Sequence, residues 1–159
     1  MKNLGLIPIR NFGIVNEEHE LYRSAQPLYG YEYEWLVRTI NLRHIINLRD
    51  DRDETISVPP HLSDLNVYNI KVKDHNPPDP SQIKRYLDLL KNLSGPILIH
   101  CEHGHGRTST FSVIAKIYLG MNVDEAINDE EYRFHYIFKH HHQEQFLRDY
   151  YSQKSLINY

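Results

Sequence analysis

Residues 96–110, PILIHCEHGHGRTST, decide the fold. The apolar run at 96–100 predicts a short buried strand, and RTSTFSVIAKIYL at 107–119 predicts a buried helix that ends at Gly120. Between them, CEHGHG forms a glycine-rich turn. A strand that leads through such a turn into a helix is a recurrent phosphate-binding geometry, because backbone N–H groups converge on the anion at the start of the helix.

Strands and helices alternate on both sides of this stretch. We expect a helical turn in the loop at 53–62, a proline-rich loop at 74–82 in which Asp79 or Ser81 caps the next helix, and Asn122 as a later cap. Hydrophobic periodicity predicts strands at 19–27, 43–50 and 66–72, and helices at 30–40, 81–93, 122–134 and 142–153. This order predicts an α/β fold with a central, mostly parallel sheet flanked by helices.

Composition limits the possible functions. The 159 residues suit a single domain spanning 1–159, and a net charge of −3 lacks the basic footprint of a nucleic-acid-binding protein. One cysteine excludes an internal disulfide and a zinc–thiolate cluster. We expect no membrane insertion, because no apolar stretch is long enough, and residues 1–13 do not resemble a secretory leader. A soluble protein is expected, cytoplasmic by default, or secreted or periplasmic if a leader has been removed.

The glycine-rich turn places a thiol and a guanidinium six residues apart. Arg107 presents a rigid fork that suits two oxygens of a phosphate, and Gly104 and Gly106 allow the backbone to turn its N–H groups inward. A helix N-terminus and a neighbouring arginine favour the thiolate form of a cysteine, so we expect Cys101 to be a nucleophile. The Gly-Lys-Ser/Thr ending of nucleotide-binding loops is missing, which argues against nucleotide hydrolysis.

These residues carry a family resemblance. The stretch HCEHGHGRT matches the His-Cys-x5-Arg-Thr signature of the cysteine-based protein tyrosine phosphatase superfamily. It most resembles the protein-tyrosine-phosphatase-like phytases, which act on inositol polyphosphates and have an Asp-His pair before a proline-containing turn, here Asp74 and His75 in KDHNPPDPSQ. The segments RSAQP and INLRDD also look like parts of such enzymes, so the resemblance runs from about residue 20 to residue 120. It implies a protein tyrosine or dual-specificity phosphatase-like fold.

The resemblance also implies a mechanism. Cys101 would attack phosphorus and form a phosphocysteine, while the amides of residues 102–107 and Arg107 bind the phosphoryl oxygens. Asp74 would protonate the leaving oxygen and later activate water, with Asp79 as the competing acid. Thr108 would donate to the Cys101 sulfur, and His100 would orient the loop. No metal ion or other cofactor is required.

Side chains around the turn are candidates for contacting substrate. The predicted substrate-binding set is Glu102, His103, Gly104, His105, Gly106, Arg107, His75, Lys73 and Arg49. For the histidines and basic residues, the alternative is an ordinary solvated surface, and Arg49 has a further alternative, bracing the turn by hydrogen bonds. The HHH run at 140–142 is assigned to a helix surface or turn, because adjacent helical residues point in different directions and rarely chelate one ion.

Several functions stay open at this point. The preferred substrate is myo-inositol hexakisphosphate or another inositol polyphosphate, and the alternative is a phosphoprotein cleaved by a tyrosine or dual-specificity phosphatase. His103, where the phytases usually have a small residue, and a chain shorter than theirs keep that alternative open. A phosphate-binding module without activity is disfavoured, because nucleophile, acid and arginine are all present. A rhodanese-type sulfurtransferase is disfavoured by its shorter Cys–Arg spacing. The oligomeric state is left open.

Overall fold

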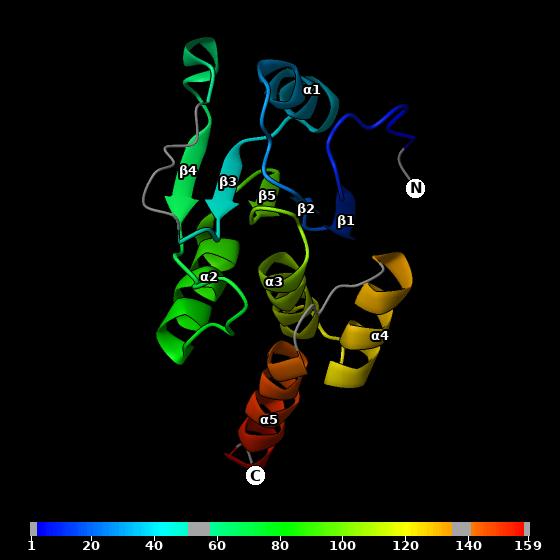
Figure 1. Cartoon of the computed structure of the whole chain (residues 1–159), viewed down its shortest axis with the longest axis vertical. Coiled ribbons are helices and arrows are strands. Elements are labelled where there is room, and N and C mark those ends of the chain that lie inside the picture. Colours follow the sequence, from blue (N-terminus) through cyan, green and yellow to red (C-terminus); the bar gives the residue numbers. More distant parts are fainter. Residues whose placement is uncertain (1–2, 51–57, 135–140, 158–159) are drawn as a thin grey trace.

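A central sheet organises the molecule. The computed structural model describes residues 3–50, 58–134 and 141–157. Within them, five strands pair in the order β1 (Gly13–Asn16), β2 (Leu21–Ser24), β5 (Ile97–His100), β3 (His44–Asn47) and β4 (Asn66–Asn69), as Figure 1 shows. Strands β2, β5, β3 and β4 are parallel, and β1 pairs antiparallel with β2 at one edge.

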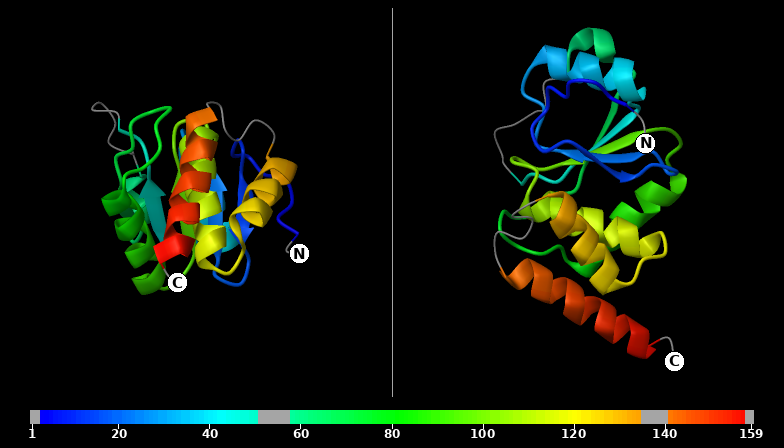
Figure 2. Two further views of the ribbon diagram at one scale, coloured as in Figure 1. Left: turned by 90° about the horizontal axis from the view of Figure 1, so that it is seen from below. Right: turned by 90° about the vertical axis from the view of Figure 1, so that its right-hand side faces the viewer.

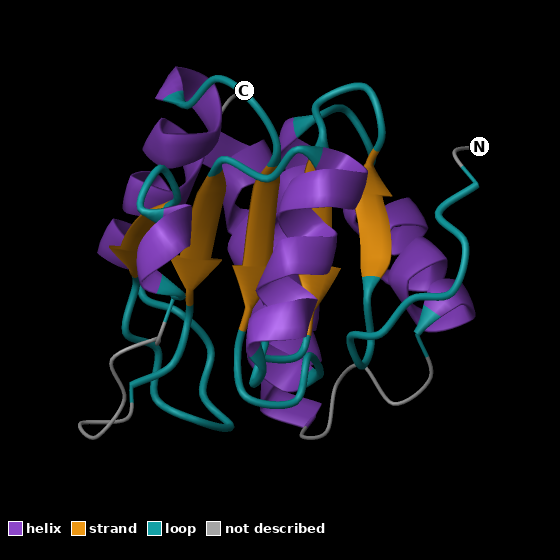
Figure 3. Ribbon diagram, turned by 90° about the horizontal axis from the view of Figure 1, so that it is seen from above, coloured by secondary structure: helices purple, strands orange, loops and turns teal. Residues whose placement is uncertain are grey.

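Helices cover both faces of this sheet. One face carries α1 (Gly30–Ile40) and the short helix η1 (Pro60–Leu62), and the other carries α2 (Pro80–Asn92), α3 (Gly106–Tyr118) and α4 (Val123–Arg133). Helix α5 (His141–Ile157) packs against α3 and α4, and in Figure 2 it lies farthest from the sheet. Figure 3 looks past α1 onto the strands behind it. The result is a layered α/β fold.

The alternation of strand side chains explains the two cores. Successive residues of a strand point to opposite faces, so Ile45 and Leu98 pack with α1 whereas Ile46 and Ile99 pack beneath α2 and α3. All four of these isoleucine and leucine side chains are fully buried. A strand that is covered on both faces favours apolar residues at consecutive positions, which is why Ile45–Ile46 in β3 and Ile97–Ile99 in β5 form unbroken apolar runs rather than alternating ones.

Most of the predicted elements are confirmed, although the strands are shorter than the predicted ranges. The helix at 30–40 is found as predicted, Asp79 and Asn122 cap α2 and α4, and the mostly parallel sheet is present. The helical turn expected in the 53–62 loop is η1, although residues 53–57 lie outside the described part of the chain. Strand β1 was not expected, since GIVN is short and carries no period-2 pattern. No helix in the described residues has the length and apolar content to cross a membrane.

The topology places the glycine-rich turn centrally. Strand β5 lies between β2 and β3 and runs parallel to both, so the carboxyl ends of these strands meet at one edge of the sheet. In open α/β sheets, ligands bind outside this edge. The turn at 101–105 leaves β5 at the middle of the edge and enters α3, and the segments that follow β2 and β4 flank it (Figure 1).

Candidate active site

The thiol lies at the base of a small cavity. Cys101 follows β5, is 3% exposed and has its sulfur facing the start of α3, where Thr108 Oγ1 donates a 2.9 Å hydrogen bond to Sγ. The cavity has a volume of about 90 Å³, a few water molecules in size. Its lining comes from three separate parts of the chain: Asp74, His75, Cys101, His103, His105, Gly106, Arg107 and Gln143. The predicted nucleophile, arginine and acid therefore meet in one place.

The carbonyl groups of the turn are held from outside. Each carbonyl of residues 101–106 accepts a hydrogen bond: Cys101 from His100 Nδ1, Glu102 from Gln26 N, His103 from Asn11 Nδ2, Gly104 from Arg23 Nη2, His105 from Ser109 N and Gly106 from Thr110 Oγ1. In a trans peptide unit, the C=O and the next N–H point in opposite directions, and none of the described peptide bonds is cis. The amides of residues 102–107 therefore turn toward the inside of the loop.

The Arg107 guanidinium is held in place by a backbone carbonyl and keeps N–H donors that are available to a ligand. Its side chain is 2% exposed, and Nη1 donates to the Val72 carbonyl at 3.0 Å. Nη2 lies 3.5 Å from Asp74 Oδ1, and the buried Nε has no hydrogen-bond partner in the described structure. A buried N–H that lacks a partner is costly unless a ligand satisfies it. This guanidinium is thus arranged to receive an anion from the cavity.

Asp74 sits on the loop between β4 and α2. Its carboxylate is 54% exposed and accepts a 2.9 Å hydrogen bond from the His75 amide. His75 has φ of +66°, a left-handed conformation that is strained for a residue with a side chain. His142, in the first turn of α5, donates from Nε2 to the His75 carbonyl at 2.6 Å. Helix α5 therefore helps to hold the loop that carries Asp74.

Asp79 has a different role. Its carboxylate accepts from Ser81 Oγ at 2.6 Å and from the Gln82 backbone amide at 2.9 Å, and the Asp79 backbone amide donates in turn to Gln82 Oε1 at 2.9 Å. This is a capping box that starts α2. The hydrogen bonds from Ser81 and Gln82 lower the pKa of the Asp79 carboxyl. Asp79 does not line the cavity and is poorly suited to donate a proton.

The predicted rim residues separate into two groups. His75, His103 and His105 line the cavity mouth. Lys73 and Arg49 do not line it. Lys73 is exposed. Arg49 Nη1 donates to the side-chain oxygen of Gln26, and the backbone N–H of Gln26 donates to the Glu102 carbonyl. Arg49 is thus placed to brace the loop.

Gln143 was not identified from the sequence. It belongs to α5, is 1% exposed and lines the cavity, yet neither Nε2 nor Oε1 has a hydrogen-bond partner in the described structure. Its amide lies so close to the turn that a Cβ placed on Gly106 would be 2.6 Å from Oε1. No local motif marks Gln143, because it lies 36 positions after Arg107 in the chain. It adds an uncommitted donor and acceptor to the cavity.

A metal ion is not evident at the site. Among the residues that the structure describes, no group of three or more histidine, cysteine, aspartate or glutamate side chains could hold one. Of the HHH run, His140 lies outside the described residues, and the other two histidines begin α5.

A thiol, a buried arginine and a ring of inward amides on a layered α/β sheet define the class of cysteine-based phosphatases. The chain belongs to the family described as DSP-PTPase phosphatase fused to NAD+ kinase, whose model matches residues 10–149. This family places the chain in the dual-specificity and protein tyrosine phosphatase superfamily.

Named relatives include inositol phosphatases. The Arabidopsis thaliana protein named inositol diphosphatase DSP5 is 36% identical over 110 residues, which cover 65% of this chain and 52% of that protein. The chain thus spans about half the length of this curated relative. The catalytic core of the PP-IP phosphatase SIW14 from S. cerevisiae superposes with a TM-score of 0.76 at 23% identity, covering 91% of this chain and 87% of that one. P. aeruginosa TpbA superposes with a TM-score of 0.66 at 22% identity, covering 82% of this chain and 80% of that one. The two structures share the fold.

Gly104 offers a test of the loop geometry. It has φ of +75°, and a Cβ there would lie 2.7 Å from the Ala25 amide nitrogen and 2.8 Å from the Ser24 carbonyl carbon. We expect Gly104→Ala to push the turn off β2 and lower kcat/KM for p-nitrophenyl phosphate at least about tenfold.

The matched control for this substitution is Gly120→Ala. Gly120 also has a positive φ, +120°, but a Cβ there meets nothing within 4 Å. It should lower the melting temperature and leave kcat/KM unchanged. Equal activity in the Gly104 and Gly120 variants would show that the turn does not need its close contact with β2.

Proposed function

We propose that the chain hydrolyses phosphate groups from inositol polyphosphates through a phosphocysteine intermediate. The observation that carries this proposal is the Cys101 thiol at the base of a phosphate-sized cavity, with the Arg107 guanidinium and the amides of residues 102–107 directed into it. Those groups match the charge and number of the oxygens of a phosphoryl group. No metal is needed to bind it.

In the first step, Cys101 Sγ attacks phosphorus. The S–P bond forms as the bond from phosphorus to the leaving oxygen breaks, and Asp74 gives its proton to that oxygen. The position of Asp74 on the wall of the cavity that holds Cys101 supports this assignment. The loop amides and Arg107 stabilise the charge on the three remaining oxygens throughout the transfer.

In the second step, water attacks the phosphocysteine. The O–P bond forms, the S–P bond breaks, and Asp74 takes a proton from the water. The 2.9 Å hydrogen bond from Thr108 Oγ1 stabilises the departing sulfur as it regains its negative charge. Gln143 presents an unpaired amide to the same cavity and is available to bind the phosphoryl group or the water.

The substrate class is supported by the cavity mouth and by the relatives. A cavity of about 90 Å³ accommodates one phosphate, and the imidazoles of His75, His103 and His105 stand where further phosphates of a crowded substrate would lie. The relative DSP5 is named an inositol diphosphatase, and the structural neighbour SIW14 is named a PP-IP phosphatase. When a diphosphate group is cleaved, the leaving group is a phosphate. A phosphate needs less protonation than the alkoxide that leaves when a phosphomonoester is cleaved. The exposed position of Asp74 suits either substrate.

A side-by-side assay tests the substrate. We expect inositol hexakisphosphate and an inositol polyphosphate bearing a diphosphate group to be cleaved with a kcat/KM at least about tenfold above that of phosphotyrosyl and phosphoseryl peptides. Released phosphate is measured at equal substrate concentrations. A preference for either peptide would reject the inositol assignment and favour a protein phosphatase.

The covalent mechanism predicts a separation of binding from turnover. Cys101→Ser should abolish turnover, because the hydroxyl is a far weaker nucleophile, while phosphate binding measured by calorimetry persists. Thr108→Ala is the companion variant, expected to accumulate phosphocysteine in a rapid quench because the sulfur leaves slowly. Turnover by Cys101→Ser at the native rate would exclude a phosphocysteine.

The acid assignment predicts a leaving-group dependence. Asp74→Asn should slow cleavage of alkyl phosphates about 10²–10⁴-fold, and of p-nitrophenyl phosphate much less, because p-nitrophenolate leaves without protonation. Asp79→Asn is the matched control: it removes a carboxylate from the same loop but keeps a good N-cap for α2, so it should leave both rates and the stability nearly unchanged. Equal slowing of both substrates by Asp74→Asn would contradict the assignment.

A further inference from the structure

A buried arginine lies beneath the phosphate-binding turn and takes no part in the steps above. Arg23, in the middle of β2, is 0% exposed. Its Nη2 donates to the Gly104 carbonyl, and its Nη1 donates to Ser109 Oγ at 2.9 Å and to Glu130 Oε1. One guanidinium therefore joins the sheet, the turn and two helices.

Glu130 in α4 fixes the direction of this guanidinium. Its second oxygen accepts from Ser112 Oγ at 2.7 Å and from Lys116 Nζ at 2.6 Å, and it is itself fully buried. Both oxygens of the Glu130 carboxylate thus have hydrogen-bond partners. These contacts fix the orientation of the carboxylate that neutralises Arg23. A guanidinium so held can present Nη2 in only one direction, toward Gly104.

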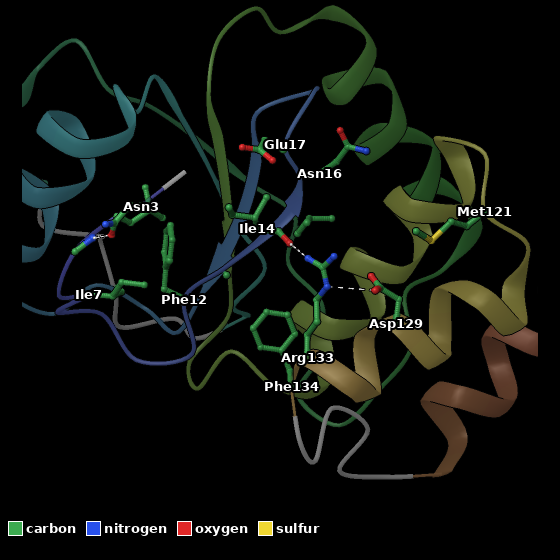
Figure 4. Close-up of a pocket in the computed structure, with 14 residues that line it drawn as sticks. Asn3, Ile7, Phe12, Ile14, Asn16, Glu17, Met121, Asp129, Arg133 and Phe134 are labelled. Atoms are coloured by element: carbon green, nitrogen blue, oxygen red, sulfur yellow. Dashed lines mark hydrogen bonds and ion pairs between the residues drawn. The ribbon is translucent and has the colours of Figure 1, made fainter. Parts of the chain in front are cut away.

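The aromatic ring of Phe134 covers the other side. The guanidinium carbon of Arg23 lies 3.9 Å from the ring centroid, a cation–π distance. Figure 4 shows Phe134 after the end of α4, close to β1, with Arg133 above it donating to the Ile14 carbonyl. The end of α4 is thereby anchored on the edge strand, and Phe134 is kept over Arg23.

We propose that Arg23 is a positioning residue, whose charge-assisted hydrogen bond to the Gly104 carbonyl keeps the amides of the turn directed at the phosphate. Among the six outward carbonyls, this one accepts from a permanently charged donor, and such bonds are shorter and stronger than neutral ones. Gly104 is also the member of the turn with a left-handed φ, where the chain reverses. The charged external contact thus falls at the residue where the turn passes through a left-handed conformation.

The buried charge of Arg23 is supported by its carboxylate partner. Burial lowers the pKa of Arg23, whereas the charge and the hydrogen bond of Glu130 raise it. Glu130 thus offsets part of the cost of burying the guanidinium that donates to Gly104.

The test uses inorganic phosphate, so it does not depend on the proposed substrate or on turnover. Arg23→Lys keeps the charge but loses the fork that reaches Gly104, Ser109 and Glu130 together, and should weaken phosphate binding about tenfold or more in calorimetry. Phe134→Leu leaves every charge in place and should weaken it about 2–5-fold. For p-nitrophenyl phosphate, KM should rise and kcat should fall in both variants.

The matched control is Phe111→Leu, which damages the core beside Tyr86 without touching Arg23. It should lower the melting temperature as much as the test variants yet bind phosphate as the native protein does. A folded Arg23→Lys variant with native phosphate affinity would overturn the proposal. If Arg23→Lys does not fold, Phe134→Leu decides: native affinity in that variant overturns the proposal, and a loss within the expected range supports it.

Discussion

The site depends on one constraint, the outward orientation of six consecutive carbonyl groups. A peptide unit cannot turn its C=O and its N–H to the same side, so the scaffold sets the inner surface of the turn by binding its outer surface. The donors come from the segment before β1, from β2 and the segment that follows it, from the last residue of β5, and from α3. A loop that must bind an anion with its backbone needs such a surrounding structure. In isolation it would turn its carbonyls inward as readily as its amides.

This constraint explains why charges are buried where an apolar core would be cheaper. Removing one partner from a buried ion pair typically costs about 3–5 kcal/mol, whereas replacing the whole pair with apolar residues is often neutral. Apolar side chains, however, cannot donate to a carbonyl. Arg23 and its partners Glu130 and Lys116 thus occupy positions that packing alone would give to leucine or methionine, and they connect the turn to α4. Stability and anion binding rest on the same contacts.

The sequence was sufficient for the sheet, most helices and the centre of the site. Continuous apolar runs mark strands buried on both faces, and the spacing from Cys101 to Arg107 is local, so both could be read from adjacent residues. Strand β1 was missed because it has no such signal and exists by pairing with β2. Gln143 was missed because nothing in α5 indicates that its first turn reaches the cavity. In the sequence, Arg23 is visible only as a charged residue within a strand. Its role could be inferred only once the structure showed its contacts with Gly104 and Glu130.

The two halves of the proposed site differ in how deeply they are buried. One half would hold the phosphoryl group of the substrate, and the other would face the leaving group. The phosphoryl end meets a rigid surround, with Cys101, Thr108 and Arg107 all buried. The leaving-group end meets Asp74, His75 and His103, whose side chains are far more exposed. Transition-state charge is stabilised best by groups that need not reorganise, and these are at the phosphoryl end. In the proposed reaction, the buried half therefore stabilises the transferred phosphoryl group, and the exposed half receives the leaving group.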